Sequence, residues 1–460
     1  MDDISTSPKP TAASQIGRWT SSLDLNEVPD DVRRIARRCM IDLVGVCLAG
    51  ANHDTARMAR SMVLAEHGDG LATIIGSPEK TTASGAALVN GAAGHVLDFD
   101  DTCYAGITHG TVIIGPAVLA IAEQIGASGE DLMAGFIAGS ECAYGLGKAT
   151  GNSVYFGGWW GTVVYGVIGA AAGAARVLGL DAKQTTNAIA IAALGTGGSI
   201  AGLGTDAKPL HCGLAAAAGL RAALLAQAGA TGPAAIFEGN RGFAALFNNG
   251  VFDTSQLDQL GQVYSLVEPG IFIKPYPSCT ANHAAVEAVG MLMSEHNLSF
   301  EDIDSVSCFV PELVDISLIY NDPENPQQAQ FSMPFTVGCM LANATFGVEH
   351  LNMQMLSDPT VRAAMAKVSM HRDDDLTQRA VAGDIGPECA RVRMNTTNGD
   401  IYESFNSVAS GAPTKPMSDD ALDDKFRILA NHAGLGGSAD PLLARLHILD
   451  TLENLHDLWP

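Results

Sequence analysis

The sequence predicts a mainly α-helical protein, in which a large all-helical domain holds a smaller α+β domain as an insertion. Two features of the 460-residue chain predict this fold. Up to about residue 265, apolar segments rich in Ala and Gly follow one another across short Gly turns, which is typical of closely packed buried helices. Strand-like alternation enters between about 266 and 408, and helical periodicity then returns. We therefore expect residues 1–265 and 409–460 to form the helical domain and residues 266–408 the α+β domain.

The long helices are predicted from their boundary residues and periodicity. Pro29, Asp30 and Asp31 favour a helix start, apolar residues follow at helical spacing, and Gly50 favours the end. After a linker at 407–420 that is rich in Ser, Gly, Pro and Asp, helical spacing predicts further helices over 421–433 and 441–458.

The strands of the inserted domain are predicted from alternating segments. Residues 305–310 form one such segment, and residues 390–396 and 400–406 form two more on either side of Asn398-Gly399. An Asn-Gly pair between two alternating segments is typical of a β-hairpin.

A cluster of carboxylates follows an uncharged segment in the N-terminal part. Residues 81–97 contain no Lys, Arg, Asp or Glu, and Asp98, Asp100, Asp101 and Thr102 come directly after them. If the helix continued, Asp98, Asp101 and Thr102 would share one face and Asp100 would point elsewhere. The cluster is either a solvated helix end or an acid/base site at the mouth of a helical core, because buried charges must be paired or pKa-shifted.

Composition narrows the classes of partner. The net charge of −24 argues against nucleic acid and anionic membranes. The longest apolar runs are rich in Gly and Ala and are bounded or interrupted by Arg, so none is expected to span a membrane. The N-terminus shows no secretory pattern. The nine cysteines lack C-x-x-C pairing, and no zinc, Walker or dinucleotide motif is present. We expect a cytoplasmic protein without a metal or cofactor.

Two of the nine lysines lie in unusually apolar surroundings. Lys208 precedes an Ala/Gly-rich helix, and His211 lies three residues further on, so both could face one anion pocket at a helix N-terminus. Lys274 lies in a turn stiffened by prolines. Each could instead be a surface lysine. His95, His283 and His350 are expected to be structural.

These segments together resemble the MmgE/PrpD family, which includes 2-methylcitrate dehydratase, cis-aconitate decarboxylase and iminodisuccinate epimerase. The resemblance rests on residues 94–102 with His109, on 205–211 and on 274–283, in family order over nearly the whole chain. Residues 274–283, with 320–323 and 331–332, look nearest to the epimerase branch.

The resemblance implies a homodimer with a cofactor-free and metal-free site between a helical domain and an α+β lid domain. The implied site residues are Asp98, Thr102, His109, Lys208 and Lys274. The lysines would bind substrate carboxylates, and His109 would be the general acid or base. Asp98 would orient a neighbour or act as the second acid/base, with Thr102 as its hydrogen-bond partner.

One segment departs from the family pattern. Family members commonly carry an aromatic-His-Pro-Thr sequence, whereas this chain has Trp160 in place of the His and Gly161 in place of the Pro. Trp160 is therefore expected to shape the substrate pocket. Tyr155 is retained in the pattern and is either an acid/base candidate or a packing residue.

The resulting prediction is a cofactor-independent lyase that acts on a small di- or tricarboxylate by proton transfer next to a carboxylate. An epimerase that uses the same first step is the alternative within the family, and a non-catalytic carboxylate-binding protein is the alternative outside it. The D-x-D-D sequence at Asp98–Asp101 also matches terpene cyclases, but 6% aromatic residues and two nearby lysines suit a carbocation poorly.

Overall fold

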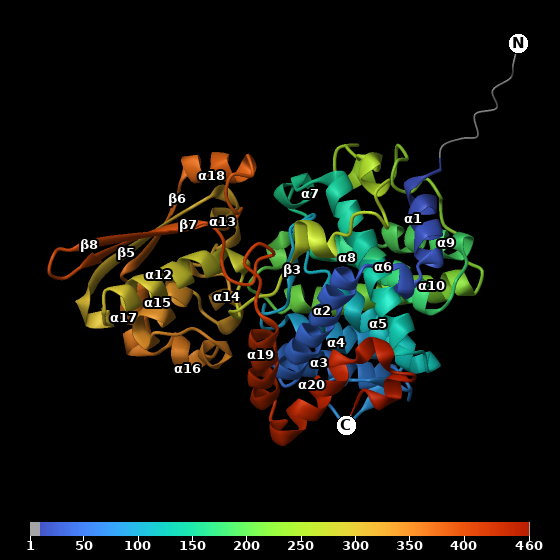
Figure 1. The fold of residues 1–460 in the computed structure, drawn as a ribbon, viewed down its shortest axis with the longest axis horizontal. Coiled ribbons are helices and arrows are strands. Elements are labelled where there is room, and N and C mark those ends of the chain that lie inside the picture. The colour runs from blue at the N-terminus through green and yellow to red at the C-terminus, as the bar shows by residue number, and fades with distance from the viewer. Residues whose placement is uncertain (1–9, 460) are drawn as a thin grey trace, which may run out of the picture.

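The computed structural model describes residues 10–459, and its N-terminal part is built from helices (Figure 1). The helices of this part are α1 (Ala12–Ser22), α2 (Asp30–Gly50), α3 (Asp54–Glu66), α4 (Ala83–His95), α5 (Thr111–Ile125), α6 (Gly129–Thr150), α7 (Ser153–Phe156), α8 (Gly161–Val177), α9 (Ala182–Leu194), α10 (Ala207–Gln227) and α11 (Phe243–Phe247). Two short strands, β1 (Ala72–Thr73) and β2 (Lys80–Thr81), pair beside them. The predicted helix from Asp30 to Gly50 is present as α2.

The second part carries a four-stranded sheet in the order β6-β5-β7-β8. Its strands are β5 (Ile303–Val310), β6 (Val368–Arg372), β7 (Ala390–Thr396) and β8 (Ile401–Asn406). Strand β5 runs parallel to β6 and antiparallel to β7, and β7 and β8 form the predicted hairpin, with Gly399 at a φ of 95° in its turn. The helices of this part are α12 (His283–Glu295), α13 (Glu312–Ser317), α14 (Pro326–Ala329), α15 (Met333–Asn343), α16 (Met353–Leu356), α17 (Pro359–Met365) and α18 (Asp374–Val381). Helices α12 and α15 pack on one face of the sheet (Figure 1).

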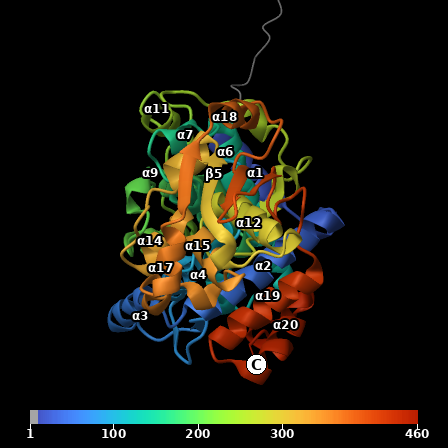
Figure 2. The ribbon, with the colours of Figure 1, turned by 90° about the vertical axis from the view of Figure 1, so that its left-hand side faces the viewer.

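The C-terminal helices return to the helical part. Helices α19 (Asp419–His432) and α20 (Ala439–His447) pack against α2, and Figure 2 shows them beside it, below the sheet. Helix α20 ends at His447, earlier than the predicted 458, because the chain continues in short 3-10 turns. One hydrophobic core joins residues 12–273 with 422–458, and a second contains residues 272–412. The mainly helical fold with a smaller sheet-containing domain is thus confirmed.

Two local features bring distant segments together at the junction of the domains. Helices α4 and α10 approach so closely that a Cβ on Gly213 would lie 2.0 Å from the Leu88 carbonyl oxygen, so only glycine fits there. Strand β3 (Thr102–Cys103) pairs antiparallel with β4 (Ile271–Phe272). The first contact places the start of α10 beside the end of α4, and the second places residues 271–274 beside the acidic cluster.

Helix α10 has the length and hydropathy of a membrane span, the one such helix among residues 10–459. In its most apolar 18-residue window, 61% of the residues are buried inside the protein. Packing against α4, α8 and α9 accounts for that apolar character.

Candidate active site

The acidic cluster lies in a buried turn rather than in a helix. Helix α4 ends at His95, and Asp98 has a left-handed backbone with a φ of 47°. The predicted common face of Asp98, Asp101 and Thr102 is therefore wrong: Asp100 turns back to His95, while Asp101 accepts a hydrogen bond of 2.6 Å from Thr111. Burial raises the pKa of Asp101 to about 7.

Two lysines hold the carboxylate of Asp98, which is only 1% exposed. The Lys208 Nζ lies 2.6 Å from one carboxylate oxygen, and the Lys274 Nζ lies 3.1 Å from the other and 2.7 Å from the Asp98 carbonyl oxygen. Burial opposes ionisation, but the two lysine charges outweigh it and hold the pKa of Asp98 well below its ordinary value. Asp98 is therefore an ion-paired carboxylate.

His95, which the sequence analysis expected to be structural, belongs to the buried hydrogen-bond network that holds Lys208. Its Nδ1 lies 2.8 Å from Asp100, and its Nε2 contacts the Lys208 Nζ. Because an ammonium group can only donate, the network assigns the ring hydrogen to Nδ1 and makes Nε2 the acceptor. Burial lowers the pKa of His95. The negative charge of Asp100 raises this pKa, and the positive charge of Lys208 lowers it further. His283 and His350, by contrast, hydrogen-bond to nearby backbone groups.

His109 is a neutral imidazole with one nitrogen free. Its Nδ1 lies 2.9 Å from the Asp101 carbonyl oxygen, which can only accept, so Nδ1 carries the hydrogen. The Thr102 hydroxyl lies 3.1 Å from the same nitrogen. Burial, followed by the nearby Lys274 charge, lowers the pKa of His109 to about 3. Among the described residues, Nε2 has no hydrogen-bond partner, so its lone pair is available to the cavity described next.

A small cavity lies between the two domains, with His109 on its wall. The helical part contributes Asp98, Thr102, His109, Tyr155, Trp160 and Lys208, and the sheet-containing part contributes Cys279, Thr280, Phe331 and Glu388 among others. Its volume is about 30 Å³, room for two or three waters at roughly 10–15 Å³ each. A carboxylate substrate can therefore enter only after side chains or domains move apart.

Two predicted site residues do not reach this cavity. Lys274 is fully buried behind Asp98 and is not part of the cavity wall. His211 is exposed on α10, so the expectation that it shares a pocket with Lys208 is wrong. Three residues along a helix turn the side chain by about 300°, and here that turn carries His211 to solvent.

The structure also brings together three groups that sequence spacing did not connect. Ligand atoms of His95, Asp100 and His109 lie within 4.8 Å of one another, an arrangement that could hold a metal ion. In the described structure, the two ring Nδ1 atoms instead donate to Asp100 and to the Asp101 carbonyl oxygen. Lys208, beside His95, adds a positive charge that opposes a second cation.

Comparison with known proteins identifies the family. The MmgE/PrpD N-terminal domain matches residues 14–255, and the MmgE/PrpD C-terminal domain matches residues 276–437. The chain belongs to the MmgE/PrpD family. Cis-aconitate decarboxylases from Mus musculus and Homo sapiens are each 25% identical to it, over 95% of this chain and 89% and 90% of theirs. A cis-aconitate decarboxylase-like protein from Aspergillus oryzae is 23% identical over 94% of this chain and 93% of its own.

Trp160 lies on the cavity wall and is 4% exposed. Its ring centroid lies 5.1 Å from the Lys208 Nζ and 5.4 Å from the His95 ring centroid. The indole therefore covers the lysine that faces the cavity, as a cation–π partner.

Tyr155 lies on the same wall, with its hydroxyl 3.1 Å from Ser317 of the other domain. Burial raises the pKa of Tyr155, so the phenol keeps its proton.

Glu388 is a cavity carboxyl group that the sequence analysis did not predict. It lies just before β7 in a loop with no motif, and only the fold brings it to the site.

Proposed function

We propose that this MmgE/PrpD-family enzyme is a cofactor-independent lyase that acts on a small di- or tricarboxylate by proton transfer next to a carboxylate. The observation that carries the proposal is the pairing of a neutral His109 and a cationic Lys208 on the wall of one closed cavity. The names of the relatives make decarboxylation the first reaction to test, and dehydration the second.

Lys208 supplies the anion-binding contact. An ammonium group has three hydrogens, and Lys208 directs two of them to His95 and Asp98. The third is left for a substrate carboxylate, as a charge-assisted donor. Such a donor stabilises negative charge that develops beside the carboxylate when a proton or CO2 leaves.

His109 supplies the base where the reaction removes a proton. Its low pKa in the empty site makes it a weak base, and the charge of Lys274 is one cause. A bound anion offsets that positive charge and so raises the pKa of His109 in the complex. The base is thus strengthened only when substrate is present.

An epimerase is the second candidate, and the position of Tyr155 favours it. Tyr155 and His109 line the same cavity, and the phenol holds its proton. A proton removed by His109 could therefore be replaced from Tyr155 on another face of the same carbon.

The test is proton NMR in D2O with cis-aconitate, 2-methylcitrate, malate and 2-methylmalate. New vinylic signals or net loss of a carboxylate indicate a lyase, whereas deuterium incorporation without net conversion indicates an epimerase. Binding of these anions without either change would leave only the carboxylate-binding alternative. Lys208→Met should abolish turnover, and Lys183→Met, at an exposed lysine of α9, is the matched control.

A further inference from the structure

Glu388 brings a carboxyl group to the active-site cavity from the domain opposite His109. It lies in the loop between α18 and β7, and it lines the cavity that His109 and Lys208 also line. The Tyr104 hydroxyl donates a hydrogen bond of 2.5 Å to one of its oxygens. Among residues 10–459, Glu388 forms no ion pair. Glu388 is half-buried, and a half-buried carboxyl group without a paired cation holds its proton more tightly than one in water.

We propose that Glu388 is the general acid of this active site, the group that delivers a proton to the reacting substrate. The inference rests on the proposed lyase function and names the acid that the function needs. His109 cannot fill that role in the empty site, because its one ring hydrogen is directed at the Asp101 carbonyl oxygen.

The electrostatic surroundings of the two groups point the same way. Burial raises the pKa of Glu388, and hydrogen bonds from Tyr104 and Thr280 only partly oppose it. Burial lowers the pKa of His109. Environments that push two pKa values apart assign an acid and a base, and Glu388 and His109 line one cavity, so Glu388 is placed as the acid and His109 as the base.

The proton balance is simple for either lyase reaction. In a decarboxylation, the C–C bond to the leaving carboxylate breaks, CO2 departs, and the electron pair left on carbon takes the proton of Glu388. In a dehydration, His109 takes a proton from carbon while Glu388 protonates the departing hydroxyl group, which leaves as water. Glu388 ends as a carboxylate in both cases and must regain a proton.

A second cavity offers the route for that proton. It has a volume of about 350 Å³ and shares Thr280 and Glu388 with the active-site cavity. Glu388 therefore lies between the reacting atoms and a larger space in which water can return the proton.

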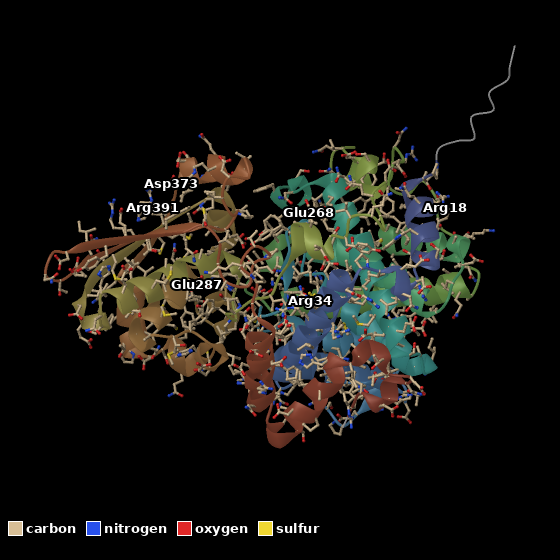
Figure 3. The ribbon with its side chains drawn as sticks, viewed as in Figure 1. Arg18, Arg34, Glu268, Glu287, Asp373 and Arg391 are labelled. Atoms are coloured by element: carbon tan, nitrogen blue, oxygen red, sulfur yellow. The ribbon has the colours of Figure 1, made fainter. Side chains whose placement is uncertain are left out.

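An ion pair joins the two elements on either side of the loop that carries Glu388. Asp373, the N-cap residue of α18, pairs with Arg391 in β7 at 2.5 Å, and Figure 3 labels both residues. Because this pair holds α18 against β7, it limits how far the loop between them can move from the site, as a catalytic group requires.

Several titratable groups surround Glu388 and set its proton affinity. They are Tyr104, Tyr155, Cys279, Asp98 and Lys274. The Tyr104 and Tyr155 phenols and the Cys279 thiol have pKa values raised by burial and stay neutral, and the pKa of Cys279 rises to about 12. Lys274 lowers the pKa of Glu388, and Asp98 raises it.

The first experiment compares pH profiles of kcat for wild type, Glu388→Gln, Glu388→Asp and Tyr104→Phe on whichever of the four carboxylates wild type converts fastest. An acid must be protonated to act, so activity falls as pH rises through its pKa. Glu388→Gln should lower kcat by about 10²–10⁴-fold and remove the alkaline limb of the pH profile. Glu388→Asp should restore part of the rate and part of that limb. Tyr104→Phe removes a donor that stabilises the carboxylate, so its alkaline limb should move to higher pH.

Asp375→Asn removes an exposed carboxylate from α18, outside both cavities, and should leave kcat unchanged. A Glu388→Gln enzyme that keeps its alkaline limb, or that changes only in KM or stability, would overturn the proposal.

The second experiment needs no turnover: an infrared difference titration of wild type against Glu388→Gln. A carboxylic acid band that is lost in the variant and titrates above the ordinary glutamate value of about 4.3 supports the proposal, and a lower midpoint refutes it. Absence of turnover on every carboxylate would instead refute the lyase function.

Discussion

Replacing Lys274 with Gln should destabilise the substrate-free protein, because this lysine supports Asp98 rather than the cavity wall. Its Nζ makes hydrogen bonds of 2.7 and 3.1 Å to Asp98, and the side chain is 0% exposed. Removing one partner of a buried pair leaves an uncompensated charge and costs about 3–5 kcal/mol. Lys208 still pairs with Asp98 at 2.6 Å, so we expect the lower end, about 3 kcal/mol.

The assay is urea unfolding without substrate at pH 7 and at about pH 3, below the ordinary aspartate pKa, read as the midpoint concentration. Because the lysines hold the pKa of Asp98 low, their stabilisation is present above its unfolded value and is lost as pH falls through the folded value. The variant should therefore lose less stability on acidification than wild type. Lys415→Gln is the control: its pair with Glu287 spans 3.1 Å but the lysine is 51% exposed, so about 0–1 kcal/mol is expected. Wild-type stability in Lys274→Gln, together with a raised KM alone, would show that Lys274 binds substrate directly.

Three further predictions concern the cavity itself. If His109 is the base, the pH profile of kcat/KM should show no acid limb near pH 6.5, because burial lowers the pKa of His109 in the free enzyme to about 3. An acid limb at the ordinary histidine pKa would contradict the assignment of His109 as the base. Turnover should survive EDTA, and loss restored by a divalent ion would make His95, Asp100 and His109 a metal site. Wild type should convert cis-aconitate and 2-methylcitrate poorly, because the Trp160 indole would face a third carboxylate without a charged partner. Trp160→His should gain that activity, and robust wild-type turnover of either tricarboxylate would refute the idea.

The sequence predicted structure where a local pattern of residues determines it. It did not predict features that depend on contacts between residues far apart in the chain. The boundaries of α2 and the Asn398-Gly399 hairpin follow from cap, turn and periodicity rules. The conformation after α4 did not, because Asp98 adopts a left-handed backbone that only its contacts with two distant lysines explain. Glu388 could not be found from the sequence for a related reason: no residue spacing indicates that a loop before β7 lies beside Tyr104, 284 residues earlier in the chain.

Charge within the site explains why a neutral acid matters. The ion-paired groups are Lys208, Lys274, Asp98 and Asp100, and their formal charges cancel, while burial lowers the pKa values of the two histidines. The whole chain carries −24, so long-range attraction does not draw an anion in. Binding must then come from directed donors, of which Lys208 has one hydrogen left. An ionised Glu388 would turn the balance negative and repel the substrate before it reached that hydrogen. The same proton that Glu388 would deliver in the reaction therefore also lets a carboxylate enter.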